Sequence, residues 1–306
     1  MSRKKIMNED NIVRNSARAW LLAARPKTLS GAAVPVVIGL AMAYSDLRAA
    51  GTFAVLPALL CVLFAFVMQI DANFINDYFD FVRGNDDETR LGPERACAQG
   101  WVSVGAMRVA IALATGMACL IGLPLIFYGG AWMLLVGAVC VAFCFLYTTH
   151  LSYHGLGDVL VIVFFGLVPV CATYYVETRG LTVCVIVAAL ACGLVIDTLL
   201  VVNNYRDIDN DRRAGKITLC VRLGEQASRH LYLALGIVAF LAGAVFVAYG
   251  YVVAAWLPFP YLFLHHGSYM KMKRIGKGAA LNAVLGETAR NMFAYGLLVS
   301  TGIILS

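Results

Sequence analysis

The sequence predicts an all-α membrane protein that crosses the bilayer many times, and its composition and charge-free stretches support this fold class. Of its 306 residues, 61% are hydrophobic and only 14% are charged, whereas about 25% are charged in an average soluble domain. The stretches 49–70, 109–157 and 230–270 contain no Asp, Glu, Lys or Arg. This composition excludes a soluble globular enzyme, a disordered chain and a nucleic-acid binder.

Nine spanning helices result when the apolar stretches are divided at their turns. One span needs about 20 apolar residues, so each of the two longest stretches holds two. The first is interrupted by Tyr128-Gly129-Gly130 and the second by Tyr249-Gly250-Tyr251, where glycine favours a turn. We expect helices near residues 28–45, 52–79, 106–127, 131–149, 157–176, 181–204, 229–248, 251–267 and 285–305. Residues 1–27 form a basic cytoplasmic segment, and residues 28–306 form one transmembrane domain.

The basic residues predict the orientation of these helices. Short loops rich in Lys and Arg stay in the cytoplasm. With the N-terminus inside and nine spans, 22 of the 24 basic residues fall on the cytoplasmic side, and only Arg48 and Arg179 fall outside. We therefore expect a multi-pass protein of the inner (cytoplasmic) membrane with its C-terminus outside.

Two acidic patches lie at the cytoplasmic ends of the second and sixth predicted helices. Carboxylates at membrane depth are costly and need a partner or a function. At about 100° per residue, Asn73, Asp77 and Asp80 share one helix face. In the same way, Asn203, Asp207 and Asp211 follow one another along the sixth helix. Two helices thus each present an Asn followed by two Asp at the same side of the membrane.

Oxygen ligands of this kind suit Mg²⁺, which prefers carboxylates, water and substrate phosphates. Neither patch has a His or Cys at ligand spacing, which argues against zinc and iron. Basic residues flank the acids, among them Lys27, Arg95, Arg206 and Lys216. A metal site with basic residues beside it suits a polyanion such as a diphosphate. Because this site lies at the end of an apolar helix bundle, we predict a lipid diphosphate substrate. Mg²⁺ would neutralise the charge on the diphosphate leaving group. The catalytic residues would be the carboxylates of Asp77, Asp80, Asp207 and Asp211.

The two acidic segments resemble the aspartate motifs of the UbiA-type intramembrane prenyltransferases. The first runs from Asn73 to Asp86 and contains Asn76-Asp77-Tyr78-Phe79-Asp80; the second runs from Asn203 to Thr218. The resemblance implies a bundle of nine helices whose active site is capped on the cytoplasmic side. It also implies that Asn73, Asp77, Asp80, Asn203, Asp207 and Asp211 hold Mg²⁺ and the diphosphate, and that Lys27, Arg95, Arg206 and Lys216 contact the diphosphate.

Further segments resemble the 1,4-dihydroxy-2-naphthoate polyprenyltransferase branch of menaquinone synthesis, including Ala24–Leu29, Arg90–Arg95 and Tyr153–Asp158. This branch implies transfer from polyprenyl diphosphate to 1,4-dihydroxy-2-naphthoate, with loss of carbon dioxide, giving a demethylmenaquinone. We expect the acceptor near Asn76, Tyr147, Tyr153 and Asp158. The alternative for the last three is turn chemistry and interface anchoring.

Two other functions remain open at this point. The chain could prenylate a different aromatic acceptor such as 4-hydroxybenzoate. It could also be a cation-coupled transporter, because the two Asn/Asp segments can be interpreted as an internal repeat. Apart from membrane lipid, the expected partners are the two substrates, with no nucleic acid.

Overall fold

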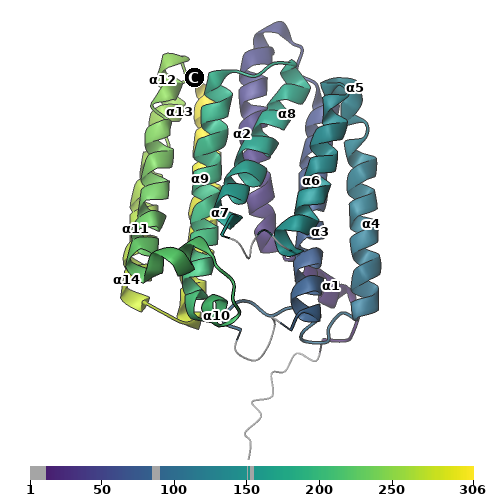
Figure 1. The fold of residues 1–306 in the computed structure, drawn as a ribbon. Coiled ribbons are helices and arrows are strands. Elements are labelled where there is room, and N and C mark those ends of the chain that lie inside the picture. Colours follow the sequence, from purple (N-terminus) through teal and green to yellow (C-terminus); the bar gives the residue numbers. More distant parts are fainter. Residues whose placement is uncertain (1–11, 85–89, 150, 152–154) are drawn as a thin grey trace, which may run out of the picture.

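The computed structural model describes residues 12–84, 90–149, 151 and 155–306, and every regular element in these ranges is a helix. Seven helical stretches in this part of the chain are long and apolar enough to cross a membrane. They are Ala17–Ala50, Val55–Val82, Val104–Gly129, Trp132–Thr149, Gly157–Thr178, Val183–Arg206 and Leu219–Ala248. Figure 1 shows them side by side in one bundle. The predicted all-α, multi-pass architecture is therefore present.

Individual helices divide some of these stretches. The first half of the chain contains α1 (Ala17–Ala24), α2 (Leu29–Leu47), α3 (Val55–Val82), α4 (Val104–Gly122), α5 (Leu125–Gly129), α6 (Trp132–Thr149) and α7 (Gly157–Val161). The second half contains α8 (Val168–Thr178), α9 (Val183–Arg206), α10 (Ile208–Arg213), α11 (Leu219–Ala242), α12 (Val245–Ala248), α13 (Val252–Trp256), α14 (Phe259–Ile275) and α15 (Asn282–Leu305).

The last two predicted spans coincide with α13–α14 and with α15, which lie outside the seven stretches named above. Both belong to the same bundle, because α15 packs against α2, α9 and α14. The main hydrophobic core lies where α2, α8, α9 and α15 meet, around Ile38, Val170, Ala189 and Tyr295. These helices therefore pack as integral parts of the fold.

Three helix boundaries differ from the sequence prediction. Residues 17–24 were expected to belong to the basic segment but form α1, whose N-terminus is capped by the hydroxyl of Ser16. The helix predicted at 229–248 begins ten residues earlier and kinks at Gly224, which has a φ of 77°. The helix predicted at 181–204 ends at Arg206, and Asp207 links α9 to α10, so Asn203, Asp207 and Asp211 do not lie on one continuous helix.

A close helix contact fixes α7 and α8 against α9. Ile162–Leu167 forms a π-helical turn between α7 and α8. A Cβ atom on Gly166 would lie 2.6 Å from the Cα atom of Gly193, so the two backbones touch. Only residues without side chains permit this approach. It holds the start of α7 beside the polar end of α9.

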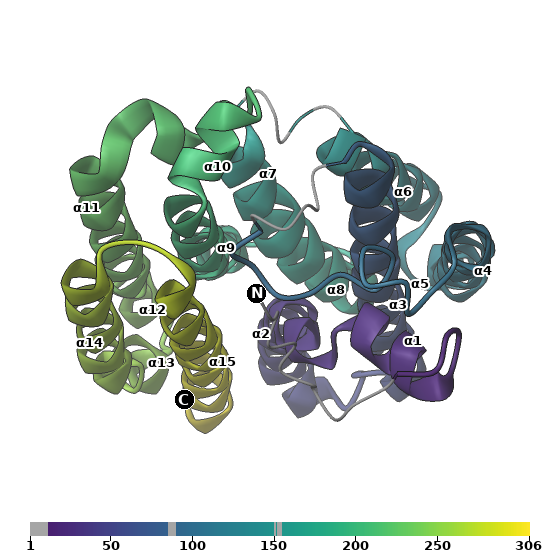
Figure 2. The ribbon, with the colours of Figure 1, turned by 90° about the horizontal axis from the view of Figure 1, so that it is seen from below.

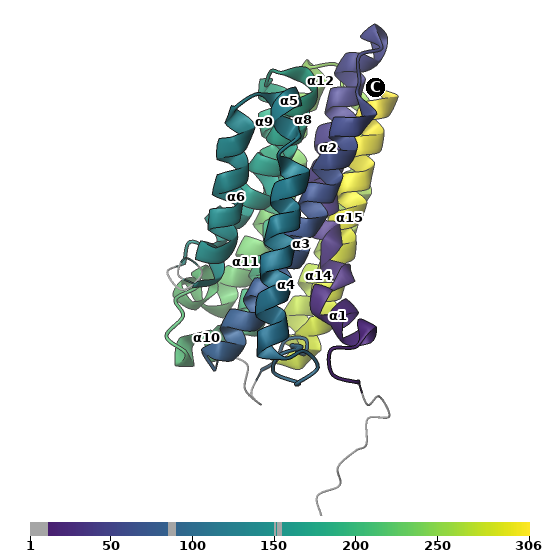
Figure 3. The same ribbon diagram turned by 90° about the vertical axis from the view of Figure 1, so that its right-hand side faces the viewer.

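One end of the bundle carries both motif regions and a crossing loop. Figure 2 views this end and shows residues 90–103, here called the crossing loop, running from beside α9 past α3 to α4. Figure 3 shows α1 and α10 at the same end, with the C-terminus at the other. Arg48 and Arg179 lie at that other end, where Arg48 donates to the carbonyl of Ile304 and Arg179 to that of Phe127. The separation of basic residues predicted from the sequence is thus reflected in the fold.

Candidate active site

A cavity of about 1070 Å³ joins the motif end of the bundle to its apolar interior. Its wall is polar at the mouth, where it includes Asn76, Asp80, Arg95, Asn203, Asp207, Asp211 and Lys216. Deeper in, the wall is apolar and includes Phe64, Met68, Phe143, Phe164 and Val176. Because Val176 lies near the far end of α8, the cavity extends along much of the bundle. This shape suits a long apolar molecule with a charged head.

The α3 side of the mouth is formed by Asn76 and Asp80, one helical turn apart. Asp80 accepts a hydrogen bond from the Arg95 guanidinium at 3.0 Å, so the crossing loop closes over this carboxylate. Asn76 accepts a hydrogen bond from the hydroxyl of Thr148 on α6. Both side chains are thus held by neighbouring elements while facing the cavity.

The other two predicted α3 ligands, Asn73 and Asp77, do not line this cavity and lie apart from the group at its mouth. Asp77 is fully buried, and its two oxygens accept the backbone N–H groups of Ala96 and Cys97, each at 2.9 Å. Asn73 is also buried and donates at 2.9 Å both to the carbonyl of Ala24 and to the hydroxyl of Thr28. These two residues anchor the crossing loop and the start of α2.

A helical wheel explains why Asp77 does not face the cavity. At about 100° per residue, the α3 residues that line the cavity, from Cys61 to Asp80, span an arc of about 160° that ends at Asp80. Asp77 lies about 60° beyond Asp80 on the same wheel, outside this arc. The predicted face was therefore displaced by part of a turn from the face that borders the cavity.

The α9 side of the mouth presents Asn203, Asp207 and Asp211, as predicted. Arg206 is buried and orders this group, because its guanidinium donates to Asn203 at 2.9 Å and to the Asp207 carboxylate at 2.6 and 2.9 Å. It also donates to the side-chain oxygen of Asn282 at 2.7 Å. Arg206, which was predicted to contact the diphosphate, thus also makes extensive hydrogen bonds to the protein itself.

Asp211 keeps one acceptor atom without a partner. Its Oδ1 atom lies 3.7 Å from the ammonium of Lys216, while Oδ2 is buried and accepts no hydrogen bond from any described residue. Burial raises the pKa of Asp211 to about 6, although the nearby Lys216 ammonium acts in the opposite direction. A carboxylate held in this way gains from a bound cation.

These oxygens fit Mg²⁺ shared with a polyanion. Among the described residues, no three His, Cys, Asp or Glu side chains converge into a complete metal site. The donors are instead divided between the α3 side, with Asn76 and Asp80, and the α9 side, with Asp207 and Asp211. Mg²⁺ is commonly bound by one or two carboxylates, with water and substrate phosphates completing its shell. Such an arrangement needs a ligand between the two sides.

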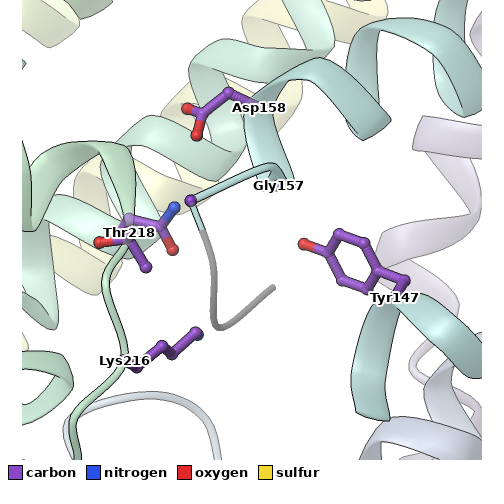
Figure 4. A pocket seen from close by; sticks show the side chains of 7 residues that line it. Tyr147, Gly157, Asp158, Lys216 and Thr218 are labelled. Carbon is purple, nitrogen blue, oxygen red and sulfur yellow. The ribbon is translucent and has the colours of Figure 1, made fainter. Parts of the chain in front are cut away.

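The predicted acceptor residues lie on another part of the same wall. Tyr147 lines the cavity and also a small adjoining pocket that includes Gly157, Asp158, Asn204, Lys216 and Thr218. Figure 4 shows Tyr147 on one side of this pocket, Thr218 and Lys216 on the opposite side, and Asp158 beyond Gly157. Tyr153 lies outside the described residues. The structure thus brings Tyr147 and Asp158 together, close to the second motif.

The basic residues at the mouth differ in part from those predicted. Lys27 is exposed and does not line the cavity, whereas Arg25 does. Arg25 adopts a left-handed conformation with a φ of 51° at the junction with the following 3₁₀ turn. Its side chain lies 3.7 Å from Asp77. The sequence signal for Arg25 was present in Ala24-Arg25-Pro26-Lys27, but the orientation of this short turn decides between the two cations.

Asn282 was missed by the sequence analysis. It begins α15, far along the chain from both motifs, and bridges Arg206 to the crossing loop. Its side-chain nitrogen donates to the carbonyl of Leu91 at 2.8 Å. A Cβ atom on Gly92 would lie 2.9 Å from Arg206, so the loop packs directly on this guanidinium. No motif spacing could have indicated Asn282, because the bridge depends on tertiary packing.

Comparisons with known proteins agree with this geometry. Residues 32–285 match the profile of the UbiA prenyltransferase family. The chain is 37% identical over 250 residues to a 1,4-dihydroxy-2-naphthoate octaprenyltransferase from Escherichia coli, covering 77% of this chain and 78% of the relative. It is 34% identical over 292 residues to a protein of the same name from Mycobacterium leprae, covering 94% and 96%.

A solved structure shares the fold at low sequence identity. It is a UbiA homolog from Archaeoglobus fulgidus bound to GPP and Mg²⁺, with a TM-score of 0.64 and 13% identity. The match covers 92% of this chain and 99% of that one. The fold of the bundle therefore occurs in other proteins.

Proposed function

Because the chain belongs to the UbiA prenyltransferase family, we propose that it transfers a polyprenyl group from polyprenyl diphosphate to 1,4-dihydroxy-2-naphthoate. One observation carries the proposal: a mouth lined by carboxylates and cations opens into a long apolar cavity. The diphosphate of the donor would bind at the mouth and its prenyl chain in the interior. The relatives named 1,4-dihydroxy-2-naphthoate octaprenyltransferase support the choice of acceptor.

The two sides of the mouth would hold the donor head group. Asn76 and Asp80 on α3, with Asn203, Asp207 and Asp211 on α9 and α10, would bind Mg²⁺. When bound, Mg²⁺ neutralises the charge that grows on the departing diphosphate. Arg95 and Lys216, together with Arg25, would contact the diphosphate oxygens from the protein side. The carboxylates of Asp80, Asp207 and Asp211 would thus contribute to the reaction by holding Mg²⁺ at the leaving group. Asp77 would position the crossing loop.

The apolar wall would protect the allylic carbocation left behind. Water at this position would quench the cation, so the cavity must exclude it. Leu160, Phe164 and Phe165 face the cavity from α7 and the π-helical turn, close to the Tyr147 side of the wall. These three apolar side chains offer no nucleophile to a cation formed beside them.

The proposed reaction balances without a net proton. The bond from the allylic carbon to the diphosphate oxygen breaks, and a bond forms to the ring carbon that carries the carboxylate. Carbon dioxide then leaves, and the electron pair of its bond returns to the ring. The product is the hydroquinone form, which oxidation converts to demethylmenaquinone. Prenylation of 4-hydroxybenzoate at a C–H position would instead release a proton.

We also propose nine membrane crossings with the N-terminus and the active site on the cytoplasmic side. Family membership is supported along residues 32–285, which include α14 and the start of α15. The positions of Arg48 and Arg179 opposite the motif end favour this orientation. Inner-membrane localisation is part of the same proposal.

Mg²⁺-dependent release of pyrophosphate tests the proposal. Membranes containing the protein are incubated with a polyprenyl diphosphate, with and without 1,4-dihydroxy-2-naphthoate. We expect acceptor-dependent pyrophosphate release that matches the amount of prenylated product. A cation-coupled transporter would release none, and this outcome from folded protein would overturn the proposal.

A further inference from the structure

A small pocket beside the main cavity contains an unusual buried carboxylate. Asp158, at the start of α7, is only 6% exposed. Both of its oxygens are buried, and neither accepts a hydrogen bond from the part of the chain that the structure describes. A carboxylate in such surroundings is costly unless a donor satisfies it. The position therefore calls for a donor from outside the protein.

The described residues that line the pocket beside Asp158 do not donate a hydrogen bond to it. The hydroxyl of Thr218 accepts the backbone N–H of Val221 and caps α11. The ammonium of Lys216 lies 3.7 Å from Asp211 and thus serves the second motif. Figure 4 shows the Tyr147 hydroxyl pointing toward the space beside Gly157, across from Asp158.

The size of the pocket defines what can enter it. Its volume is about 10 Å³, which is room for one water-sized polar group and not for a ring. Tyr147, Asn204 and Lys216 line both the pocket and the main cavity, so the two spaces adjoin. A planar molecule in the cavity could therefore extend a single hydroxyl group into the pocket.

We propose that this pocket receives one ring hydroxyl of the aromatic acceptor and that Asp158 accepts its proton. The inference rests on the proposed prenyl transfer and adds a residue that makes the ring nucleophilic. A hydrogen bond to a carboxylate draws the proton from the hydroxyl and raises the electron density of the ring. The acceptor would thus be recognised as a hydroxylated aromatic by a single buried contact.

The proton moves in a closed cycle. As the ring carbon bonds to the allylic carbon, the hydroxyl proton passes to Asp158 and the ring oxygen becomes a carbonyl. Loss of carbon dioxide returns an electron pair to the ring, and the ring oxygen takes the proton back from Asp158. No external acid, base or oxidant is required.

The test compares Asp158→Asn with wild type on two acceptors. The first acceptor is 1,4-dihydroxy-2-naphthoate, which has two ring hydroxyls. The second is a monomethyl ether of it, and both possible ethers are assayed. Only one of these ethers blocks the hydroxyl that enters the pocket. With the parent acceptor, the variant should lose about tenfold to hundredfold in kcat/KM, the equivalent of one hydrogen bond to a charged group. With the matching ether, wild type and variant should differ little. Asp158→Glu should restore part of the activity.

The donor side serves as an internal control. Stabilisation against thermal unfolding by Mg²⁺ and an unreactive polyprenyl thiolodiphosphate should be the same in wild type and in Asp158→Asn. Asp71→Asn is a matched substitution, because Asp71 is also a buried carboxyl and accepts a hydrogen bond from Thr115 away from both cavities. It should leave the discrimination between parent acceptor and ether unchanged.

Three outcomes would overturn the inference. They are wild-type kcat/KM in Asp158→Asn, an equal loss on the parent acceptor and on both ethers, and loss of the donor-induced stabilisation. If wild type prenylates only 4-hydroxybenzoate, the proposed acceptor is wrong, and the same comparison is made with 4-hydroxybenzoate and its methyl ether. If folded wild type prenylates no hydroxylated aromatic, both proposals fall.

Discussion

Asp77 and Asp80 lie three residues apart on α3, yet the structure predicts opposite consequences for replacing them by Asn. Asp77 holds the backbone N–H groups of Ala96 and Cys97 with its two oxygens. Asp77→Asn keeps one oxygen and turns an NH₂ group toward the other buried N–H. Loss of one charged hydrogen bond and of one satisfied donor costs about 3 kcal/mol. The substitution should therefore weaken the anchoring of the crossing loop.

Asp80 has a different environment. Its side chain is 23% exposed and pairs with Arg95, a contact that Asn can retain through its oxygen. Asp80→Asn should therefore change the free energy of unfolding by less than about 1 kcal/mol. Because it removes a carboxylate proposed to bind Mg²⁺, activity should fall at least about a hundredfold.

Thermal unfolding in detergent and prenyl transfer, measured on the same preparations, separate the two roles. A loss of about 3 kcal/mol corresponds to a midpoint lowered by about 6–12 °C in Asp77→Asn, while Asp80→Asn should unfold near the wild-type temperature. An unchanged midpoint together with abolished activity in Asp77→Asn would refute the reasoning and return Asp77 to the metal ligands.

Three further predictions follow from the same geometry. Asn282→Ala should lower activity about tenfold, because Arg206 and the carbonyl of Leu91 each lose a hydrogen bond; an Asn282→Ala enzyme with wild-type kinetics would show that the bridge does not position Arg206. Removal of Mg²⁺ by EDTA should stop transfer, and added Mg²⁺ should restore it; full activity in EDTA would mean that the basic residues alone stabilise the leaving group. In intact cells, a single cysteine placed at Arg179 should react with an impermeant thiol reagent and one at Lys277 should not; the reverse pattern would contradict the proposed orientation.

The apolar stretches and the distribution of basic residues were sufficient to predict a multi-pass helical bundle with both acidic patches at one end. The spacing of Asp80, Asp207 and Asp211 also predicted their positions at the mouth of the cavity. Both predictions depend on local sequence, because span length and helical periodicity are set by neighbouring residues. They required no knowledge of how distant segments pack.

The roles of Asn73, Asp77 and Lys27 could not be predicted in this way. A helical wheel gives the direction of a side chain but not the element that meets it. The direction of Asp77 is occupied by the backbone of Ala96 and Cys97, which belong to the crossing loop. Asn282 shows the same limit, since its partners Arg206 and Leu91 become neighbours only when α15 packs beside α9.

Release of carbon dioxide is the measurement that tests the central claim most directly. Purified protein in lipid, Mg²⁺ and a polyprenyl diphosphate are incubated with 1,4-dihydroxy-2-naphthoate labelled in its carboxylate, beside a tube that contains 4-hydroxybenzoate instead. We expect labelled carbon dioxide, pyrophosphate and prenylated naphthohydroquinone in equal amounts, and no product with 4-hydroxybenzoate. A prenylated product that retains the labelled carboxylate, or transfer to 4-hydroxybenzoate alone, would contradict the account.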